Sequence, residues 1–398
     1  MSTVLAPSDL FALDPGARPN VGGRIRCLPG SRWQIADATH CVEVASDPPG
    51  GEGCLVVIEA LWDGTVLRAA SVLEVSSTPS VPPKESVRLL DRGVGRALRA
   101  RARALQHVRQ FFAQRDFLEV DTPQRVPSPG LDLHLDAYEA DGAFLITSPE
   151  YQMKRLLVGG LPRIYQIVHC FRAGERGASH NSEFTMLEWY RAFAGVDDVM
   201  RDTEQLVEHV VKELTQGAVL DRGGRSCDVE APFEQMTVVE AFERFAGLDA
   251  DTTLRLAESE EEVYFRRMVE QVEPGLASLS RAVFLRDFPA VHASLARRRP
   301  DAPRLCERFE LYVGGVELCN GFGELTDPKE QRARFDLDRA ARKAAGKPVY
   351  PVDERFLDAL EQGMPAAGGN ALGLDRLIAL CFGAKSLADV MTFPDEWL

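Results

Sequence analysis

The chain has 398 residues and a formal net charge of −14, with 45% hydrophobic and 27% charged residues. This length suits one large domain with a small one, and the composition is ordinary for a soluble globular protein. The negative charge argues against a protein that coats nucleic acid broadly, although it leaves room for a local basic patch.

No apolar run approaches the length of a membrane span, and the chain starts without a basic segment followed by an apolar core. The eight cysteines are scattered and form no C-x-x-C pair, which is typical of free thiols in a reducing compartment. We therefore expect a cytoplasmic protein that does not associate with membranes.

The first hundred residues contain a cluster of short β-like segments. Residues 1–18 show no hydrophobic period, so we expect a flexible N-terminus. Between residues 19 and 76, five β-like runs alternate with turns rich in Gly, Pro and Asp, which predicts a reduced OB-like β-barrel. Residues 77–95 begin with a run rich in Ser and Pro and are expected to be a linker.

Recognition of single-stranded nucleic acid needs exposed aromatic rings and positive charge. The predicted barrel offers Trp33, Trp62 and His40, but its acidic residues outnumber its arginines. We interpret it as a structural or protein-contacting module, and we expect that it does not read tRNA.

From residue 96 onward the pattern changes to helices and longer strands. Arg96–Arg115 is amphipathic and rich in arginine, so it is either a solvated helix face or a docking surface; Arg297–Arg299 poses the same choice. Apolar runs on either side of the loop Ala173–Ser182 predict an antiparallel hairpin. Further helices are predicted over Asp197–Thr215, Thr237–Phe245 and Glu258–Val272.

Three stretches of this region carry residues suited to nucleotide chemistry. Arg172 and Phe184 lie at the ends of the hairpin loop, where a guanidinium can bind phosphate and a ring can cover a base. A surface hairpin with solvated charges is the simpler alternative. Gly368–Ala384 is a glycine-rich segment that enters a helix carrying Arg376.

The third stretch, Arg308–Pro328, carries Glu310, Glu317 and Glu324 at intervals of seven residues within mainly apolar, β-rich sequence. Carboxylates buried among apolar strands are unfavourable unless they bind cations. Which of the three share a face depends on strand boundaries and bulges that the spacing leaves open.

Together these stretches resemble the catalytic core of the class II aminoacyl-tRNA synthetases, in the lysyl branch. FRAGERGASHNSEFTMLEWY is similar to motif 2 and GGNALGLDRL to motif 3. With TSPEYQMKRLL, ELCNGFGELTD and GMP, the chain most resembles the elongation factor P–(R)-β-lysine ligases, which are truncated lysyl-tRNA synthetase paralogues. The resemblance covers roughly residues 95–398, and the N-terminal barrel is a departure from the familiar members.

The resemblance implies an α+β fold, in which a class II synthetase-like antiparallel sheet flanked by helices (96–398) follows the OB-like barrel. It also implies a homodimer built through the helix and strand of motif 1. The implied activity is ATP-dependent formation of a β-lysyl or lysyl adenylate, with release of diphosphate, and transfer to a lysine of elongation factor P.

The resemblance assigns catalytic roles to Arg172, at the α-phosphate and substrate carboxylate, and to Arg376, at the terminal phosphate. Glu310 and Glu317 match the pair that holds Mg²⁺. The other implied ATP contacts are Glu175, His180, Asn181, Phe184, Leu318 and Gly373. The implied amino-acid contacts are Ser148, Pro149, Glu150, Glu188, Tyr190, Asn320, Glu324 and Ala371.

Several carboxylates around one cavity favour a substrate with two ammonium groups. Ser148 and Ala371 stand where lysyl-tRNA synthetases usually have alanine and glycine, which favours β-lysine. Gly174 occupies the position where motif 2 usually carries an acid. Either Glu175, one residue later, takes over that role through a loop shift, or the backbone makes the contact on the adenine side.

Three other functions are compatible with parts of this pattern. They are a lysyl-tRNA synthetase-like enzyme that charges tRNA, a lysine-activating paralogue with another acceptor, and a non-catalytic sensor of lysine or uncharged tRNA. The acidic barrel argues against the first. The presence of Arg172, Arg376, Glu310 and Glu317 argues against the sensor, which does not need a complete set of phosphate and metal ligands.

Overall fold

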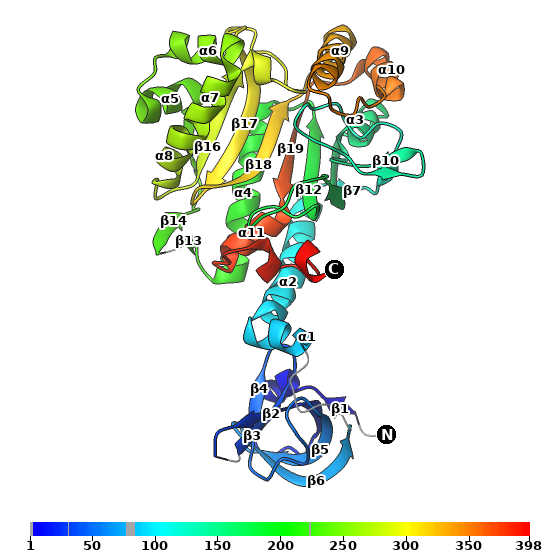
Figure 1. Ribbon diagram of the computed structural model, residues 1–398, viewed down its shortest axis with the longest axis vertical. Helices are drawn as coiled ribbons and strands as arrows, with labels where there is room; N and C mark the ends of the chain where they lie inside the picture. Colours follow the sequence, from blue (N-terminus) through cyan, green and yellow to red (C-terminus); the bar gives the residue numbers. More distant parts are fainter. Residues whose placement is uncertain (1–2, 31, 77–83, 223) are drawn as a thin grey trace. The chain divides into compact units, whose positions relative to one another are not determined.

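The computed structural model of the chain describes residues 3–30, 32–76, 84–222 and 224–398 (Figure 1). The chain divides into two compact units, Met1–Ala100 and Arg101–Leu398. Residues 77–83 of the expected linker lie outside the described residues. Within the described ranges, no helix is long and apolar enough to cross a membrane.

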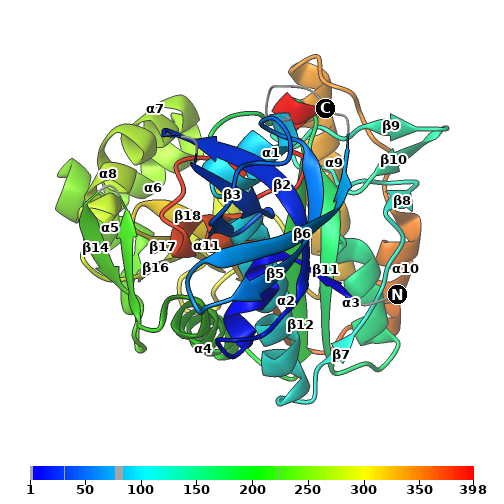
Figure 2. The same cartoon turned by 90° about the horizontal axis from the view of Figure 1, so that it is seen from below.

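The N-terminal unit contains the predicted barrel (Figure 2). Its sheet has the order β1-β2-β3-β4-β6-β5, and an additional pairing between β2 and β5 closes it. The five main strands are β2 (Asn20–Leu28), β3 (Arg32–Ala36), β4 (Cys41–Val44), β5 (Leu55–Trp62) and β6 (Leu67–Val75). Alternate residues point inward, as a strand period of two requires, so the barrel prediction is confirmed.

Both tryptophans of the barrel lie in its core, and Trp33 and Trp62 are 0% and 1% exposed. Neither ring can therefore stack on a nucleic-acid base at the barrel surface. Of the three rings considered from the sequence, only His40 is exposed, and it contacts the ring of Phe11 at 5.2 Å between centroids.

The segments on either side of the barrel differ from expectation. The described part of residues 1–18 is ordered: β1 (Val4–Leu5) pairs with β2, and the 3-10 helix η1 (Pro7–Ala12) buries Leu10 completely. A single apolar anchor leaves no period in a sequence, which is why this contact was not predicted. The end of the expected linker is helical, with α1 (Lys84–Ser86), the π-helical turn η2 (Val87–Asp91) and the start of α2 (Val94–Ala113).

The second unit is built on an eight-stranded sheet with the order β15-β16-β17-β18-β19-β12-β11-β7. The pairings from β16 to β11 are antiparallel, while β15 and β7 join the two ends in parallel. The strands are β7 (Leu118–Glu119), β11 (Arg163–Phe171), β12 (Glu183–Ala192), β15 (Glu234–Thr237), β16 (Val283–Pro289), β17 (Leu305–Val313), β18 (Val316–Gly323) and β19 (Ala367–Gly373). The predicted hairpin is β11–β12, and β19 brings the distant glycine-rich segment between β12 and β18.

Helices cover this sheet as the sequence predicted, with one exception. The apolar side of α2 packs on the hairpin, where Phe112 stacks on Tyr165 with ring centroids 4.4 Å apart. The predicted helix Asp197–Thr215 is α4 (Val196–Thr215) and Thr237–Phe245 is α5 (Val238–Ala246). The predicted helix Glu258–Val272 is instead α7 (Glu261–Arg267) followed by the π-helical turn η3 (Met268–Val272), and α6 (Ala250–Ser259) precedes it.

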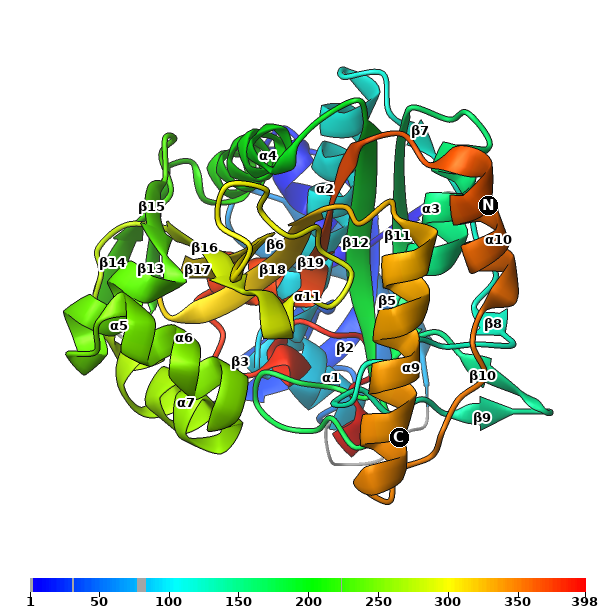
Figure 3. The ribbon, with the colours of Figure 1, turned by 90° about the horizontal axis from the view of Figure 1, so that it is seen from above.

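Figures 1 and 3 show two helical groups at opposite ends of the sheet. Beside β16 lie α5, α6, α7 and α8 (Glu273–Ala277). At the other end lie α3 (Glu150–Val158), α9 (Pro328–Ala344) and α10 (Glu354–Gly363). Small sheets of β8 (Arg125–Val126), β9 (Glu139–Ala140) and β10 (Ala143–Leu145), and of β13 (Val219–Arg222) and β14 (Arg225–Asp228), lie at the margins. The C-terminal segment contains α11 (Leu374–Cys381) and the short turns η5 (Leu387–Asp389) and η6 (Asp395–Trp397); η4 is Ala290–His292.

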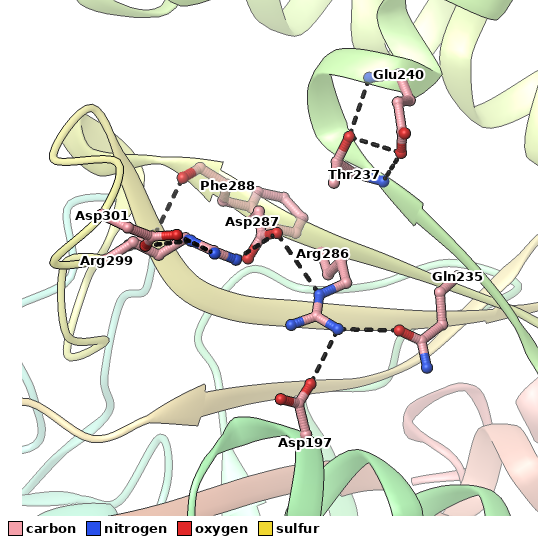
Figure 4. Close-up of polar contacts among 10 residues, drawn as sticks. Asp197, Gln235, Thr237, Glu240, Arg286, Asp287, Phe288, Arg299 and Asp301 are labelled. Carbon is pink, nitrogen blue, oxygen red and sulfur yellow. Dashed lines mark hydrogen bonds and ion pairs between the residues drawn. The ribbon is translucent and has the colours of Figure 1, made fainter.

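The arginine run Arg297–Arg299 is occupied by ion pairs and is not a free basic patch. The three arginines pair with Glu307 at 2.6 Å, Glu330 at 3.2 Å and Asp287 at 2.9 Å, respectively. Figure 4 shows Asp287 at a bulge of β16, between Arg299 and Arg286. Asp287 has a φ of 59°, a left-handed conformation that aspartate tolerates better than most residues.

Candidate active site

One cavity lies on the face of the sheet where β12, β19 and β18 run side by side. Loop 128–135, α3 and α9 complete its wall, and all but two of the predicted site residues line it. The two exceptions are Pro149 and Glu310. The site therefore combines residues from segments that are more than two hundred positions apart in the chain, such as Ser148 and Arg376.

Arg172 follows directly after β11 and lies at one end of the cavity. Its backbone N–H donates to the Ser182 carbonyl at 2.8 Å, which closes the base of the hairpin loop. Its guanidinium lies over the Phe184 ring, 5.1 Å from the centroid, and 3.8 Å from the Glu175 carboxylate. The loop thus places Glu175 in the cavity wall beside Arg172, so a guanidinium, an aromatic face and a carboxylate share one corner.

Arg376 faces the same corner from the first turn of α11. It donates to the Glu317 carbonyl at 2.9 Å, and its other terminal nitrogen lies 2.9 Å from His180 Nε2. Burial and the neighbouring Arg376 lower the pKa of His180, so His180 is neutral at physiological pH. Asn181 is buried and donates to the Glu183 carbonyl at 2.7 Å, which orders the end of the loop.

Glu310 and Glu317 lie on neighbouring strands but play unequal parts in the wall. Glu317 lines the cavity, where burial and repulsion from Glu310 raise its pKa to about 7. Glu310 lies behind it and accepts hydrogen bonds from Arg308 at 2.7 Å and Tyr312 at 2.9 Å. Across the described residues, no group of three or more His, Cys, Asp or Glu side chains is arranged to hold a metal.

The opposite end of the cavity is acidic and closed. Glu188 is 1% exposed and accepts hydrogen bonds from Ser148 at 2.7 Å and Tyr190 at 2.6 Å. Burial, with repulsion from Glu150, raises its pKa to about 7. In the sheet, Glu188 pairs with Ala371 and Ala371 with Asn320, so these three residues form one row across the floor.

Sequence reasoning missed Lys154, which lies among the acidic groups of this closed end. Its ammonium is 2.6 Å from Glu150 and 2.5 Å from Glu324, and its side chain is 1% exposed. Burial raises the pKa of Glu324 to about 8, although the nearby Lys154 acts to lower this pKa. Among the described residues Lys154 is the cation paired with Glu324, and none donates a hydrogen bond of good geometry to either Glu324 oxygen, so Glu324 keeps acceptor capacity for a cation in the cavity.

Two glycines of β19 are required by side-chain packing. A Cβ on Gly369 would lie 2.3 Å from the Tyr190 ring and 2.6 Å from Glu324, and one on Gly368 would lie 2.5 Å from Val199. At Gly373 a Cβ would meet only the Arg376 side chain, at 3.4 Å. Open space on that side is what a bound nucleotide would use.

Comparison with known proteins identifies the group to which this architecture belongs. The family of class II tRNA synthetases (D, K and N) matches residues 83–396. The elongation factor P–(R)-β-lysine ligase of Proteus mirabilis is 41% identical over 309 residues, which cover 74% of this chain and 93% of the relative. The chain belongs to this ligase family.

The ligases of Photorhabdus laumondii and Vibrio campbellii are each 40% identical, over 74% and 75% of this chain and 93% and 95% of their own lengths. The ligase family is therefore matched almost over its whole length, while about a quarter of this chain lies beyond the match. Because the synthetase family matches only from residue 83, the N-terminal barrel is an addition to the shared catalytic unit.

Proposed function

We propose that the protein activates (R)-β-lysine with ATP and transfers it to a lysine side chain of elongation factor P. The observation that carries the proposal is the charge layout of the cavity. Arg172 and Arg376 lie at one end, and the buried Glu188 and Glu324, the half-buried Glu150 and one lysine lie at the other. A substrate with a carboxylate at one end and two ammonium groups matches this layout.

At the arginine end, Arg172 and Arg376 would bind the phosphates of ATP, and Phe184 would cover the adenine. The attack of the substrate carboxylate on the α-phosphorus needs no protein nucleophile, so the chain contributes position and electrostatic stabilisation. His180, Asn181, Glu175, Leu318 and Gly373 complete the proposed nucleotide wall.

Mg²⁺ fits the carboxylates of Glu317 and Glu310. Their mutual repulsion, visible in the raised pKa of Glu317, would be relieved by a cation. When bound, the ion would neutralise phosphate charge. Glu310 would become a ligand of the ion once its carboxylate gave up the hydrogen bond that it accepts from Arg308.

At the acidic end, Glu150, Glu188 and Glu324 would bind the substrate's two ammonium groups, with Tyr190, Asn320, Ser148, Pro149 and Ala371 shaping the pocket. The Ser148 hydroxyl donates to Glu188, so it fixes the orientation of that carboxylate, whose residue pairs with Ala371 in the sheet. We propose that this row of the floor sets the preference between the β- and α-isomers.

The barrel supports a protein acceptor over tRNA. Both tryptophans are buried, and the barrel retains more acidic than basic residues. We further propose a cytoplasmic homodimer, with an oligomer contact at α2 and the sheet edge β7, where Leu118 is 52% exposed. All eight cysteines are free thiols, as a reducing compartment requires.

The test supplies ATP, Mg²⁺ and either (R)-β-lysine or L-lysine, with elongation factor P and tRNA as competing acceptors. We expect the factor to gain the mass of one lysyl unit, more rapidly with the β-isomer. Charged tRNA with an unmodified factor would overturn the proposal. Adenylate formation with neither acceptor modified would indicate a different acceptor.

A further inference from the structure

A third part of the cavity wall is used by neither the nucleotide nor the amino-acid end. It lies between α9 and loop 128–135, and Gln331, Phe335 and Asp338 of α9 line it together with Leu131 and Asp132. These α9 residues are spaced four and three apart, so they share one face of the helix. Figure 3 shows α9 alongside β11 and β12, and Phe335 packs in one apolar cluster with Tyr190 of the cavity floor.

This wall is connected to the reacting end of the cavity by a short series of contacts. Arg172 donates to the Thr147 carbonyl at 3.4 Å, and the Thr147 hydroxyl donates to the Pro129 carbonyl at 2.7 Å. Pro129 belongs to loop 128–135. At the far end of this loop, the carbonyl of Asp136 accepts a hydrogen bond from the backbone N–H of Ala173 at 2.7 Å. The wall therefore opens beside Arg172, where the activated carboxyl group would lie.

The wall carries polar groups that lack partners. Gln331 is 1% exposed, and none of the described residues donates a hydrogen bond to its buried side-chain carbonyl oxygen. Throughout the described part of the chain, no group donates a hydrogen bond to the half-buried Asp338. Burial and repulsion from Asp132 raise the pKa of Asp338 to about 6. A buried amide oxygen without a donor and two carboxylates that repel each other favour a ligand with several N–H donors.

The nearby arginines do not provide that ligand. Arg342 donates to the backbone carbonyls of Asp132, Leu135 and Pro348. Arg334 donates to the Ser294 and Ala296 carbonyls. The Asp132 carboxylate accepts a hydrogen bond from the His134 backbone at 2.7 Å, and within the described ranges it forms no ion pair.

Charge counting distinguishes this wall from the amino-acid pocket. When ionised, Glu150, Glu188 and Glu324 with Lys154 carry a net charge of −2, which two substrate ammonium groups neutralise. Asp132 and Asp338 add two further negative charges on a different wall. Arg334 and Arg342 act on Asp338 electrostatically, but each is already paired with another carboxylate, Glu330 and Asp136 respectively. Besides the metal, the only other cation in the proposed reaction is the lysine ammonium of the acceptor.

We propose that Asp338, Asp132 and Gln331 form the site that receives the acceptor's primary ammonium and guides it to the aminoacyl adenylate. There the ammonium releases one proton to water, and the neutral amine attacks the acyl carbon. The carbon–nitrogen bond forms, the carbon–oxygen bond to AMP breaks, AMP leaves, and the nitrogen loses its second proton to water. This inference rests on the proposed function for the chemistry of transfer, but it concerns any primary-amine acceptor. Asp338 is a binding and positioning residue for the acceptor, and it is not required to contact ATP.

The experiment compares two small acceptors in the same enzyme. With ATP, Mg²⁺ and (R)-β-lysine, the adenylate is offered n-butylamine, which is an ammonium ion at neutral pH, or hydroxylamine, which is uncharged. We expect Asp338→Asn to lower the ratio of butylamide to hydroxamate at least tenfold and to raise the KM for the elongation factor P of Proteus mirabilis. Asp338→Glu should restore most of the ratio.

Asp336→Asn is the matched control, because Asp336 is exposed on the opposite side of α9 and should leave every rate unchanged. An unchanged ratio in Asp338→Asn would overturn the inference. A rise in the KM for β-lysine in ATP–diphosphate exchange, with an unchanged ratio, would assign Asp338 to the amino-acid pocket instead. Amide formation with n-butylamine but none on elongation factor P would refute the proposed acceptor and leave the site intact, whereas the absence of any hydroxamate would refute both.

Discussion

Binding of the amino-acid substrate should release protons, because two carboxyl groups of the pocket are partly protonated without it. Burial raises the pKa of Glu188 to about 7 and that of Glu324 to about 8. An entering pair of ammonium groups favours the ionised forms and lowers both pKa values. The protons leave as the substrate binds, so affinity should increase with pH between about 6 and 8.

The magnitude follows from the two pKa values. At pH 7 a carboxyl group with a pKa of about 8 is roughly nine-tenths protonated and one with a pKa of about 7 is half protonated, so the pair holds about 1.4 protons. We expect release of about 1.4 protons per substrate at pH 7 and about 0.6 at pH 8. Without Glu324, the Glu324→Gln variant should release about half a proton at pH 7.

Isothermal titration calorimetry of (R)-β-lysine binding measures this number. The observed enthalpy is plotted against the ionisation enthalpy of several buffers at one pH, and the slope is the number of protons exchanged. Asp336→Asn should reproduce the parent slope. A slope of zero at pH 7 would refute the reasoning, because it would show that both carboxylates are already ionised in the free protein.

Three substitutions test other contacts of the site. Arg172→Ala should abolish ATP–diphosphate exchange while leaving the thermal midpoint nearly unchanged, since the side chain is partly exposed; exchange at the parent rate would contradict the motif 2 assignment. Lys154→Met removes the cation that pairs with Glu150 and Glu324, so one more carboxyl group of the pocket must be protonated in the folded protein. This protonation should lower the free energy of unfolding by about 4 kcal/mol at pH 7.5 but by only about 1 kcal/mol at pH 5.5. Urea unfolding at both pH values checks this, and equal losses would mean that Lys154 contributes only packing. Gly369→Ala should destabilise the protein by about 1–3 kcal/mol through overlap with Tyr190 and raise the KM for the amino acid; an unchanged KM for ATP is the internal control.

Local patterns predicted those parts of the site that a single segment supplies. The hairpin carries Arg172 and Phe184 at the two ends of one loop, so strand pairing alone brings them together. Arg376 follows the glycine-rich strand directly, and helix α11 must present it close to that strand end. The resemblance to known motifs reinforced both assignments.

Pattern was less informative where burial decides the role of a charged residue. Lys154 lies in an ordinary amphipathic helix, where a lysine usually faces water, and its partner Glu324 is far away in sequence. The spacing of seven between Glu310 and Glu317 gave no sign that a turn and a bulge would put only Glu317 on the cavity wall. The glycines of β19 suggested close approach by a ligand, whereas Gly368 and Gly369 make room for protein side chains.

The sequence by itself determined the two-part organisation, the strand-rich start and the α+β unit, because the period of apolar residues records which face of each element is buried. It also determined the positions of Arg172 and Arg376, for which we propose a role at the phosphates of ATP, because both lie next to turns of defined geometry. Only the tertiary structure decided that Trp33 and Trp62 face inward, that Lys154 neutralises part of an acidic pocket, and that Asp338 and Asp132 meet in one wall of the cavity. Those outcomes depend on pairs of residues brought together by the packing of separate segments, and no local period encodes such distances.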